Sequence, residues 1–139
     1  MLRFALVLSL LAGPRHFEVN ASFEAPKKAG ADGAIAVKFA ALDPDVHVNE
    51  LPAARIKLPA GSVLVDKQPA ASEGMGAFDP ETAKYLDLSL PVYFPAAVAK
   101  AAPKGTHQVP LTLTYFYCSK REGWCRKGSA ELSVAVSVP

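Results

Sequence analysis

The sequence of 139 residues has only two cysteines and lacks the motifs that common catalytic or ligand-binding sites require. It contains no Gly-x-Ser-x-Gly nucleophile motif, no phosphate-binding loop and no dinucleotide fingerprint. Its three histidines, His16, His47 and His107, show no metal-ligand spacing with one another or with the cysteines. These absences argue against hydrolase, nucleotide-dependent and zinc-dependent activities, and we expect neither a cofactor nor a metal ion.

Positive and negative charges are nearly balanced. Fifteen Lys and Arg residues against thirteen Asp and Glu residues leave a formal net charge of +2. A nucleic-acid-binding protein would instead concentrate its basic residues in a patch or stripe. We therefore expect no nucleic-acid partner. Half of the residues are hydrophobic, which is enough for a single domain of this length to bury a core of its own.

Long hydrophobic runs are also missing. The mostly apolar segment 4–12 follows Arg3 and is too short to span a bilayer as a helix, so we expect no transmembrane segment. A charged start and an apolar centre are typical of an export signal, although Pro14 is unfavourable for cleavage after Gly13. The alternative is a buried N-terminal strand. We predict a signal-like segment at 1–13 and a periplasmic or secreted protein, in a compartment where disulfides persist.

What the sequence does contain is a regular alternation of apolar and polar residues. Twelve prolines and nine glycines separate the alternating stretches and argue against long helices. Period two over many segments indicates strands with one buried and one solvated face. We therefore predict a single domain over 14–139 that is an all-β, immunoglobulin-like β-sandwich of seven to eight antiparallel strands. The predicted strands cover residues 15–24, 34–40, 45–49, 54–58, 62–66, 85–93, 109–118 and 126–138.

Two segments depart from this alternation. Residues 96–102 are rich in alanine and lie between Pro95 and Pro103, so we expect a short helix of one or two turns there. Residues 67–84 form the longest irregular stretch of the chain. A loop of this length inside a compact domain is usually functional or disordered.

The two cysteines, Cys118 and Cys125, flank the turn of the last predicted hairpin with six residues between them. Strand parity places both on the outward, solvated face, and facing residues of an antiparallel pair are close enough for a disulfide. One interpretation is a structural clip, since closing so short a loop contributes roughly 2–3 kcal/mol in the chain-entropy model. The other interpretation is an exchangeable redox pair, because both sulfurs face the side that a partner thiol can reach.

Basic residues surround the pair. Positive neighbours stabilise a thiolate and so favour thiol–disulfide exchange, although charged residues also simply solvate a loop tip. Trp124, directly before Cys125, has three interpretations: a cover for the disulfide, a docking point for a partner, or a plug that reaches back into the core. The basic candidates for tuning a thiolate or docking a partner are Lys120, Arg121, Arg126 and Lys127.

The segment from Pro110 to Cys118, with Glu122-Gly-Trp-Cys125 after it, resembles the periplasmic N-terminal domain of transmembrane thiol:disulfide interchange reductases of the DsbD type. The resemblance implies an immunoglobulin-like domain that takes electrons from a membrane carrier and reduces thioredoxin-fold proteins. It also implies that Cys125 attacks the partner disulfide and that Cys118 resolves the mixed disulfide. The chain differs from the family pattern by one extra residue between the cysteines and by Arg126-Lys127 in place of two prolines.

The same resemblance implies a cap loop with an aromatic residue that shields the cysteines. The irregular stretch 72–79 has the corresponding position, with Phe78 as the first candidate shield and Met75 as the second. We therefore expect a thiol–disulfide exchange module that works with a separate membrane electron carrier and a thioredoxin-fold protein. The alternative is a non-catalytic interaction domain with a structural hairpin disulfide.

Overall fold

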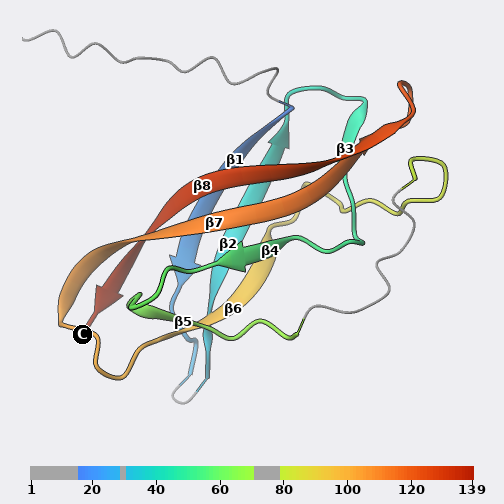
Figure 1. Ribbon diagram of the computed structural model, residues 1–139. Coiled ribbons are helices and arrows are strands. Elements are labelled where there is room, and N and C mark those ends of the chain that lie inside the picture. Colours follow the sequence, from blue (N-terminus) through green and yellow to red (C-terminus); the bar gives the residue numbers. More distant parts are fainter. Residues whose placement is uncertain (1–15, 29–30, 71–78) are drawn as a thin grey trace, which may run out of the picture.

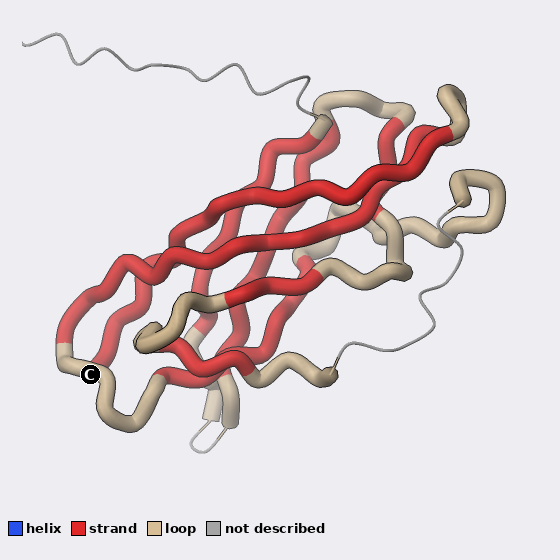
Figure 2. The backbone as a smooth tube through the Cα atoms, viewed as in Figure 1, coloured by secondary structure: helices blue, strands red, loops and turns tan. Residues whose placement is uncertain are grey.

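The structure, a computed structural model, describes residues 16–28, 31–70 and 79–139. In these ranges the chain forms eight antiparallel strands in two sheets and no helix, as Figures 1 and 2 show. The predicted all-β sandwich is therefore confirmed. The strands are β1 (Phe17–Glu24), β2 (Gly33–Ala41), β3 (Val46–Val48), β4 (Arg55–Lys57), β5 (Leu64–Asp66), β6 (Val92–Val98), β7 (Gly105–Ser119) and β8 (Trp124–Val138).

One sheet has the order β1-β2-β6-β5, and the other is organised around β7. β8 pairs with β7 over 15 residues of each strand. Because β8 occupies one edge of β7 throughout, β3 and β4 follow one another along its other edge, opposite 117–119 and 112–114. Asn49, the first residue after β3, still donates its backbone N–H to the Phe116 carbonyl of β7 at 2.8 Å.

The inward-facing residues of the two sheets form one core. Strand alternation places apolar residues on the facing sides, and these sides pack together. At the end of the core near the start of β1, Phe17 packs edge-to-face against Phe39, Tyr115 and Tyr117, with ring centroids 5.7–6.1 Å apart. The largest fully buried apolar side chains are Ile35, Val37, Val46, Val48, Leu111, Leu113, Val134 and Val136.

The structure differs from the sequence expectation around β6. The predicted helix over 96–102 is wrong, because Ala96 continues β6, pairs with Gly33 and is completely buried. The predicted strand 85–93 is displaced toward the C-terminus, and a turn occupies residues 87–90. In that turn Asp87 accepts hydrogen bonds from the backbone N–H and the hydroxyl of Ser89. Pairing with β2 thus outweighs the helix propensity of a short alanine run.

Some predictions fall outside the described residues. They are the signal-like segment 1–13 and the two shield candidates, Met75 and Phe78. The part of the chain that the structure describes contains no helix capable of crossing a membrane.

Candidate redox site at the β7–β8 hairpin

Cys118 and Cys125 form a disulfide between register partners of β7 and β8, with their Cα atoms 4.0 Å apart. The long hairpin brings them together, because its register pairs Ser119 with Trp124 and Cys118 with Cys125 just before the turn. Both cysteines lie on the face of the sheet that points away from the core. The predicted pairing is therefore confirmed.

The two cysteines differ in exposure. Cys118 is completely buried, whereas Cys125 is partly exposed. The expectation that both lie open on the solvated face is thus wrong for Cys118. The reason is that Cys118 is flanked on both sides, by Cys125 on β8 and by His47 on β3, and a further segment lies alongside β3.

That further segment is the stretch 84–86, which extends the sheet beyond β3. Glu50 N–H donates to the Lys84 carbonyl and Leu86 N–H donates to the Val48 carbonyl, both at 2.8 Å. Between them, Asn49 and Tyr85 form an isolated antiparallel bridge. Figure 1 shows this stretch reaching the β3 end of the β7–β8 hairpin. The outer face beside Cys118 is therefore covered although it is not part of the core.

An aromatic stack lies over this covered face. The Tyr85 ring stacks on His47 at 4.8 Å between centroids, and Lys120 Nζ lies 5.4 Å from the centre of the Tyr85 ring. The Tyr85 hydroxyl donates to the Pro80 carbonyl at 3.2 Å. Burial, followed by the negative charges of Asp79 and Glu81, raises the pKa of Tyr85 above its usual value. The Tyr85 ring thus lies against His47, the register partner of Cys118.

Tyr85 and Asn49 were not among the candidates that sequence reasoning identified. Tyr85 was assigned to the start of a strand, and its aromatic ring next to an irregular loop was the signal that could have marked it. The sequence indicates that His47 is a packed or surface histidine on a strand, with no specific role at the cysteines. The surroundings of Cys118 come from β8, from β3 with the adjacent Asn49, and from the stretch 84–86 beside them, and the sheet pairing places these segments together.

Replacing Tyr85 with alanine should expose Cys118 and accelerate reduction of the disulfide. We expect dithiothreitol to reduce Tyr85→Ala about tenfold faster than wild type, because exchange depends on access to the sulfur. Free thiols trapped with a maleimide over time give the rate. Tyr93→Ala is the matched control, since Tyr93 is an exposed tyrosine on β6 in the other sheet. Equal rates for Tyr85→Ala and Tyr93→Ala would refute the covering role of Tyr85.

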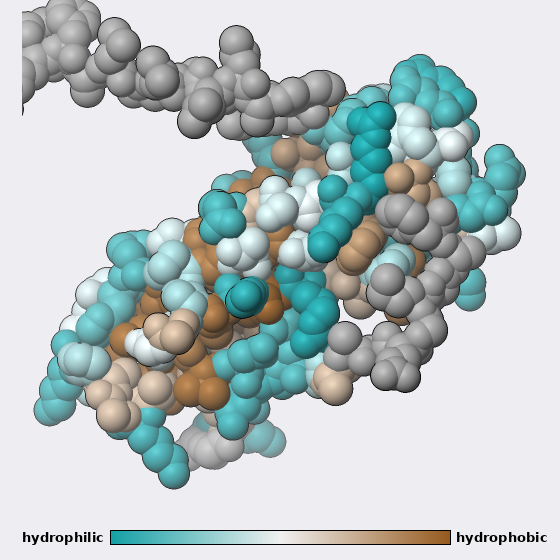
Figure 3. All heavy atoms as spheres, viewed as in Figure 1, coloured by the Kyte–Doolittle hydropathy of each residue, from teal (hydrophilic) through white to brown (hydrophobic). Residues whose placement is uncertain are grey.

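The basic residues near the cysteines are distributed over different surfaces. Lys120 lies beside Tyr85, on the side of the disulfide. Arg121 forms a 2.8 Å ion pair with Asp45, and the Arg126 guanidinium lies 3.9 Å from the centre of the Trp124 ring. Figure 3 shows hydrophilic side chains gathered at this tip of the molecule. Two of the four candidate cations, Arg121 and Arg126, are thus engaged with Asp45 and Trp124, whereas Lys120 lies against Tyr85.

Trp124 lies on the opposite side of the hairpin from the disulfide. Its ring meets Tyr117 edge-to-face at 5.7 Å and lies 5.5 Å from His16, and it packs against the edge of the core. Its Nε1–H donates to a Glu122 carboxylate oxygen at 2.6 Å. Of the three interpretations offered by the sequence, this position favours the core plug over a cover for the disulfide.

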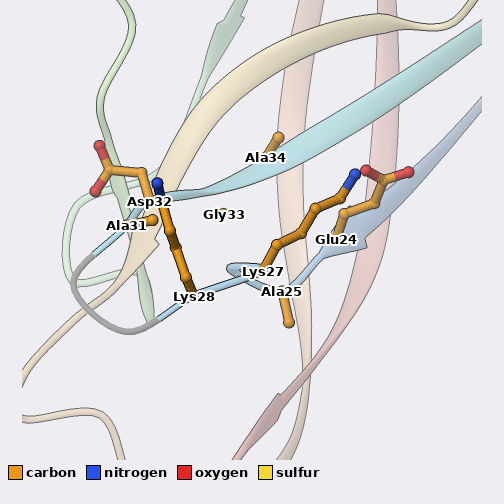
Figure 4. A pocket seen from close by; sticks show the side chains of 8 residues that line it. All are labelled: Glu24, Ala25, Lys27, Lys28, Ala31, Asp32, Gly33 and Ala34. Atoms are coloured by element: carbon orange, nitrogen blue, oxygen red, sulfur yellow. The ribbon is translucent and has the colours of Figure 1, made fainter.

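The described surface also has depressions. An open one of about 280 Å³ lies at the β1–β2 turn, which Figure 1 shows at the other end of the sandwich from the β7–β8 turn; Figure 4 shows the side chains that line it. Its side chains are alanines and the flexible charged groups of Glu24, Lys27, Lys28 and Asp32. No group of His, Cys, Asp and Glu side chains suited to a metal ion occurs in the described ranges. The disulfide is the chemically distinctive feature of the described structure.

Comparison of the chain with protein-family models, curated proteins and solved structures finds no significant match. What is established is an all-β, two-sheet sandwich with a disulfide between Cys118 and Cys125.

Proposed function

We propose that this domain is a thiol–disulfide exchange module in which Cys125 is the attacking sulfur and Cys118 the resolving sulfur. The observation that carries the proposal is the unequal exposure of the two cysteines. A partly exposed sulfur bonded to a buried one gives a partner a single accessible point of attack. The resemblance of the cysteine segment to the DsbD-type domain assigns the same roles to the same two positions.

The proposed exchange has two steps, in which electrons and protons balance. In the reduced domain, the Cys125 thiolate attacks a disulfide of a thioredoxin-fold partner, forms a mixed disulfide and releases one partner thiolate, which takes up a proton. Cys118 then loses its proton and attacks Cys125 Sγ, which breaks the mixed disulfide and releases the second partner thiol. Two electrons pass to the partner and the Cys118–Cys125 bond is restored. A separate membrane electron carrier with a dithiol would reduce the domain again by the reverse steps.

The surroundings of the pair support this chemistry. Lys120 is a cation on the same side of the hairpin as the sulfurs, and a nearby positive charge favours the thiolate. The covered position of Cys118 protects the resolving sulfur from unrelated thiols and oxidants. Such a module would act in the periplasm or another oxidising compartment, where disulfide exchange partners occur.

The second candidate is a structural disulfide in a non-catalytic interaction domain. The complete burial of Cys118 favours it, since inert structural cystines are typically inaccessible. The two functions differ in the stability of the disulfide toward reduction, and this difference can be measured without knowledge of the partner.

The reduction potential decides between the two functions. We expect equilibration of the intact protein with glutathione redox buffers to give a value above about −300 mV, the approximate limit below which structural disulfides of secreted proteins lie. The fraction of reduced protein is read from alkylated and unalkylated species by mass spectrometry. A potential well below that limit would establish the structural clip and exclude exchange with the proposed partners.

A further inference from the structure

Asn49 is a buried polar residue in direct contact with the disulfide. Its side chain is completely buried, and its backbone N–H donates to the Phe116 carbonyl at 2.8 Å. Asn49 Oδ1 lies 3.2 Å from Cys118 Sγ. No described residue offers a hydrogen-bond partner to Asn49 Nδ2. A buried carboxamide normally has its hydrogen bonds satisfied, so this arrangement requires an explanation.

In the oxidised state, the disulfide is a poor hydrogen-bond partner for the Asn49 carboxamide. A disulfide sulfur has no hydrogen, so Cys118 cannot donate to Oδ1, and it is only a weak acceptor for an N–H. Reduction changes both the donor and the acceptor capacity of the Cys118 sulfur. The S–H of a Cys118 thiol can donate to Oδ1, and half a turn of the carboxamide presents Nδ2–H to a Cys118 thiolate. Both hydrogen bonds exist only after the S–S bond is broken.

We propose that Asn49 is a positioning residue that stabilises Cys118 in the reduced state and so raises the reduction potential of the pair. Reduction adds two electrons and two protons to the Cys118–Cys125 bond and yields two thiols, of which only the buried one contacts Asn49. The inference rests on the proposed function for its biological purpose, because a stabilised reduced form matters for a pair that cycles. The physical effect is independent of any partner protein.

The test compares Asn49→Leu with wild type in equilibrium with dithiothreitol. Leucine keeps a similar volume and removes both hydrogen-bonding groups, so we expect an about tenfold smaller equilibrium constant for reduction, which corresponds to a potential about 30 mV lower. Gln68→Met is the matched control. Gln68 is also a carboxamide with backbone hydrogen bonds, but it bonds Ile56 on β4, away from the cysteines. This control should retain the wild-type potential.

A second variant distinguishes the hydrogen-bonding role of Asn49 toward Cys118 from a mere packing contribution of its side chain. Asn49→Asp keeps the shape of the side chain and replaces the donor with a negative charge, which disfavours a thiolate. In a Cys125→Ser background, Asn49→Asp should raise the pKa of the Cys118 thiol. At a pH below the pKa of this thiol in both proteins, the thiolate fraction should be about tenfold smaller in the Asn49→Asp variant than in the protein that keeps Asn49. Ultraviolet thiolate absorbance across a pH titration measures this without access of a reagent to the buried sulfur.

The outcomes distinguish this inference from the proposed function. Unchanged potentials in Asn49→Leu, or an unchanged Cys118 titration in Asn49→Asp, would overturn the role of Asn49. If Asn49→Leu does not fold, the Asn49→Asp titration decides alone. A wild-type potential well below the structural limit together with an Asn49-dependent shift would reject the exchange function and retain the effect of Asn49 on Cys118.

Discussion

A single thiol at Cys125 should react with iodoacetamide roughly a hundredfold faster than a single thiol at Cys118, because a buried group reacts only through local opening. The comparison uses Cys118→Ser, which leaves Cys125, and Cys125→Ser, which leaves Cys118. In the structure Cys118 is enclosed by His47, Cys125 and the Tyr85 segment, whereas Cys125 is partly exposed. Alkylation at one pH, followed by mass spectrometry, gives both rates.

The same pair of variants tests the direction of attack. Cys118→Ser should trap a mixed disulfide with a thioredoxin-fold protein through Cys125, because no resolving thiol remains to release it. Cys125→Ser should trap little. Unfolding in denaturant is the control, since it should bring the two alkylation rates close together by removing the difference in burial. Equal rates in the folded proteins, or preferential trapping through Cys118, would contradict the proposed roles.

Replacing Gly128 with valine should destabilise the sandwich by about 1–3 kcal/mol, the usual cost of inserting extra methyl groups into a packed site. Gly128 pairs with Tyr115 across the β7–β8 hairpin, and the tyrosine ring lies directly over the glycine. A Cβ added at Gly128 would lie within 2.5–2.9 Å of three Tyr115 ring carbons. The ring would have to shift, and it packs against Phe17 and Phe39. Chemical denaturation measures the change in the free energy of unfolding.

A neighbouring position and a compensating change serve as controls. Ser129→Val adds a β-branched side chain at the next residue, which is exposed, and should leave stability nearly unchanged. Tyr115→Leu should recover part of the loss in the Gly128→Val background, because a smaller side chain frees space above residue 128. Additive effects of the two substitutions would show that the ring and the glycine are not coupled.

The local signals in the sequence were sufficient for most of the fold. Period-two alternation located the strands around Phe17 and Leu111, and the same parity placed Cys118 and Cys125 on one face of the hairpin. Parity also places Trp124 on the inward face of β8, where the structure finds it. The alanine segment after Pro95 was misassigned because a strand in a buried sheet is decided by its neighbour, here β2, more than by its own helix propensity.

The covering of Cys118 could not be predicted in the same way. Alternation distinguishes inward from outward residues along one strand, but it does not show which distant segment lies alongside an outward face. Tyr85 lies against His47, the register partner of Cys118, because the chain at Asn49 pairs with residues 84–86. The carboxamide of Asn49 is equally hidden from local patterns, since a single asparagine at the end of a short strand most often indicates a turn.

The position of the cysteines near the tip of a long hairpin has a consequence for how the protein is made. β7 and β8 are consecutive in the chain and joined by a short turn, so their contacts are local and form early relative to the pairing of distant segments. The two thiols therefore meet and can be oxidised while the rest of the sandwich is still assembling. The stretch 84–86 pairs with the β3 edge in the folded protein and covers the bond from that side. Oxidation of the nascent hairpin thus does not require the exchange partner that we propose for the finished domain.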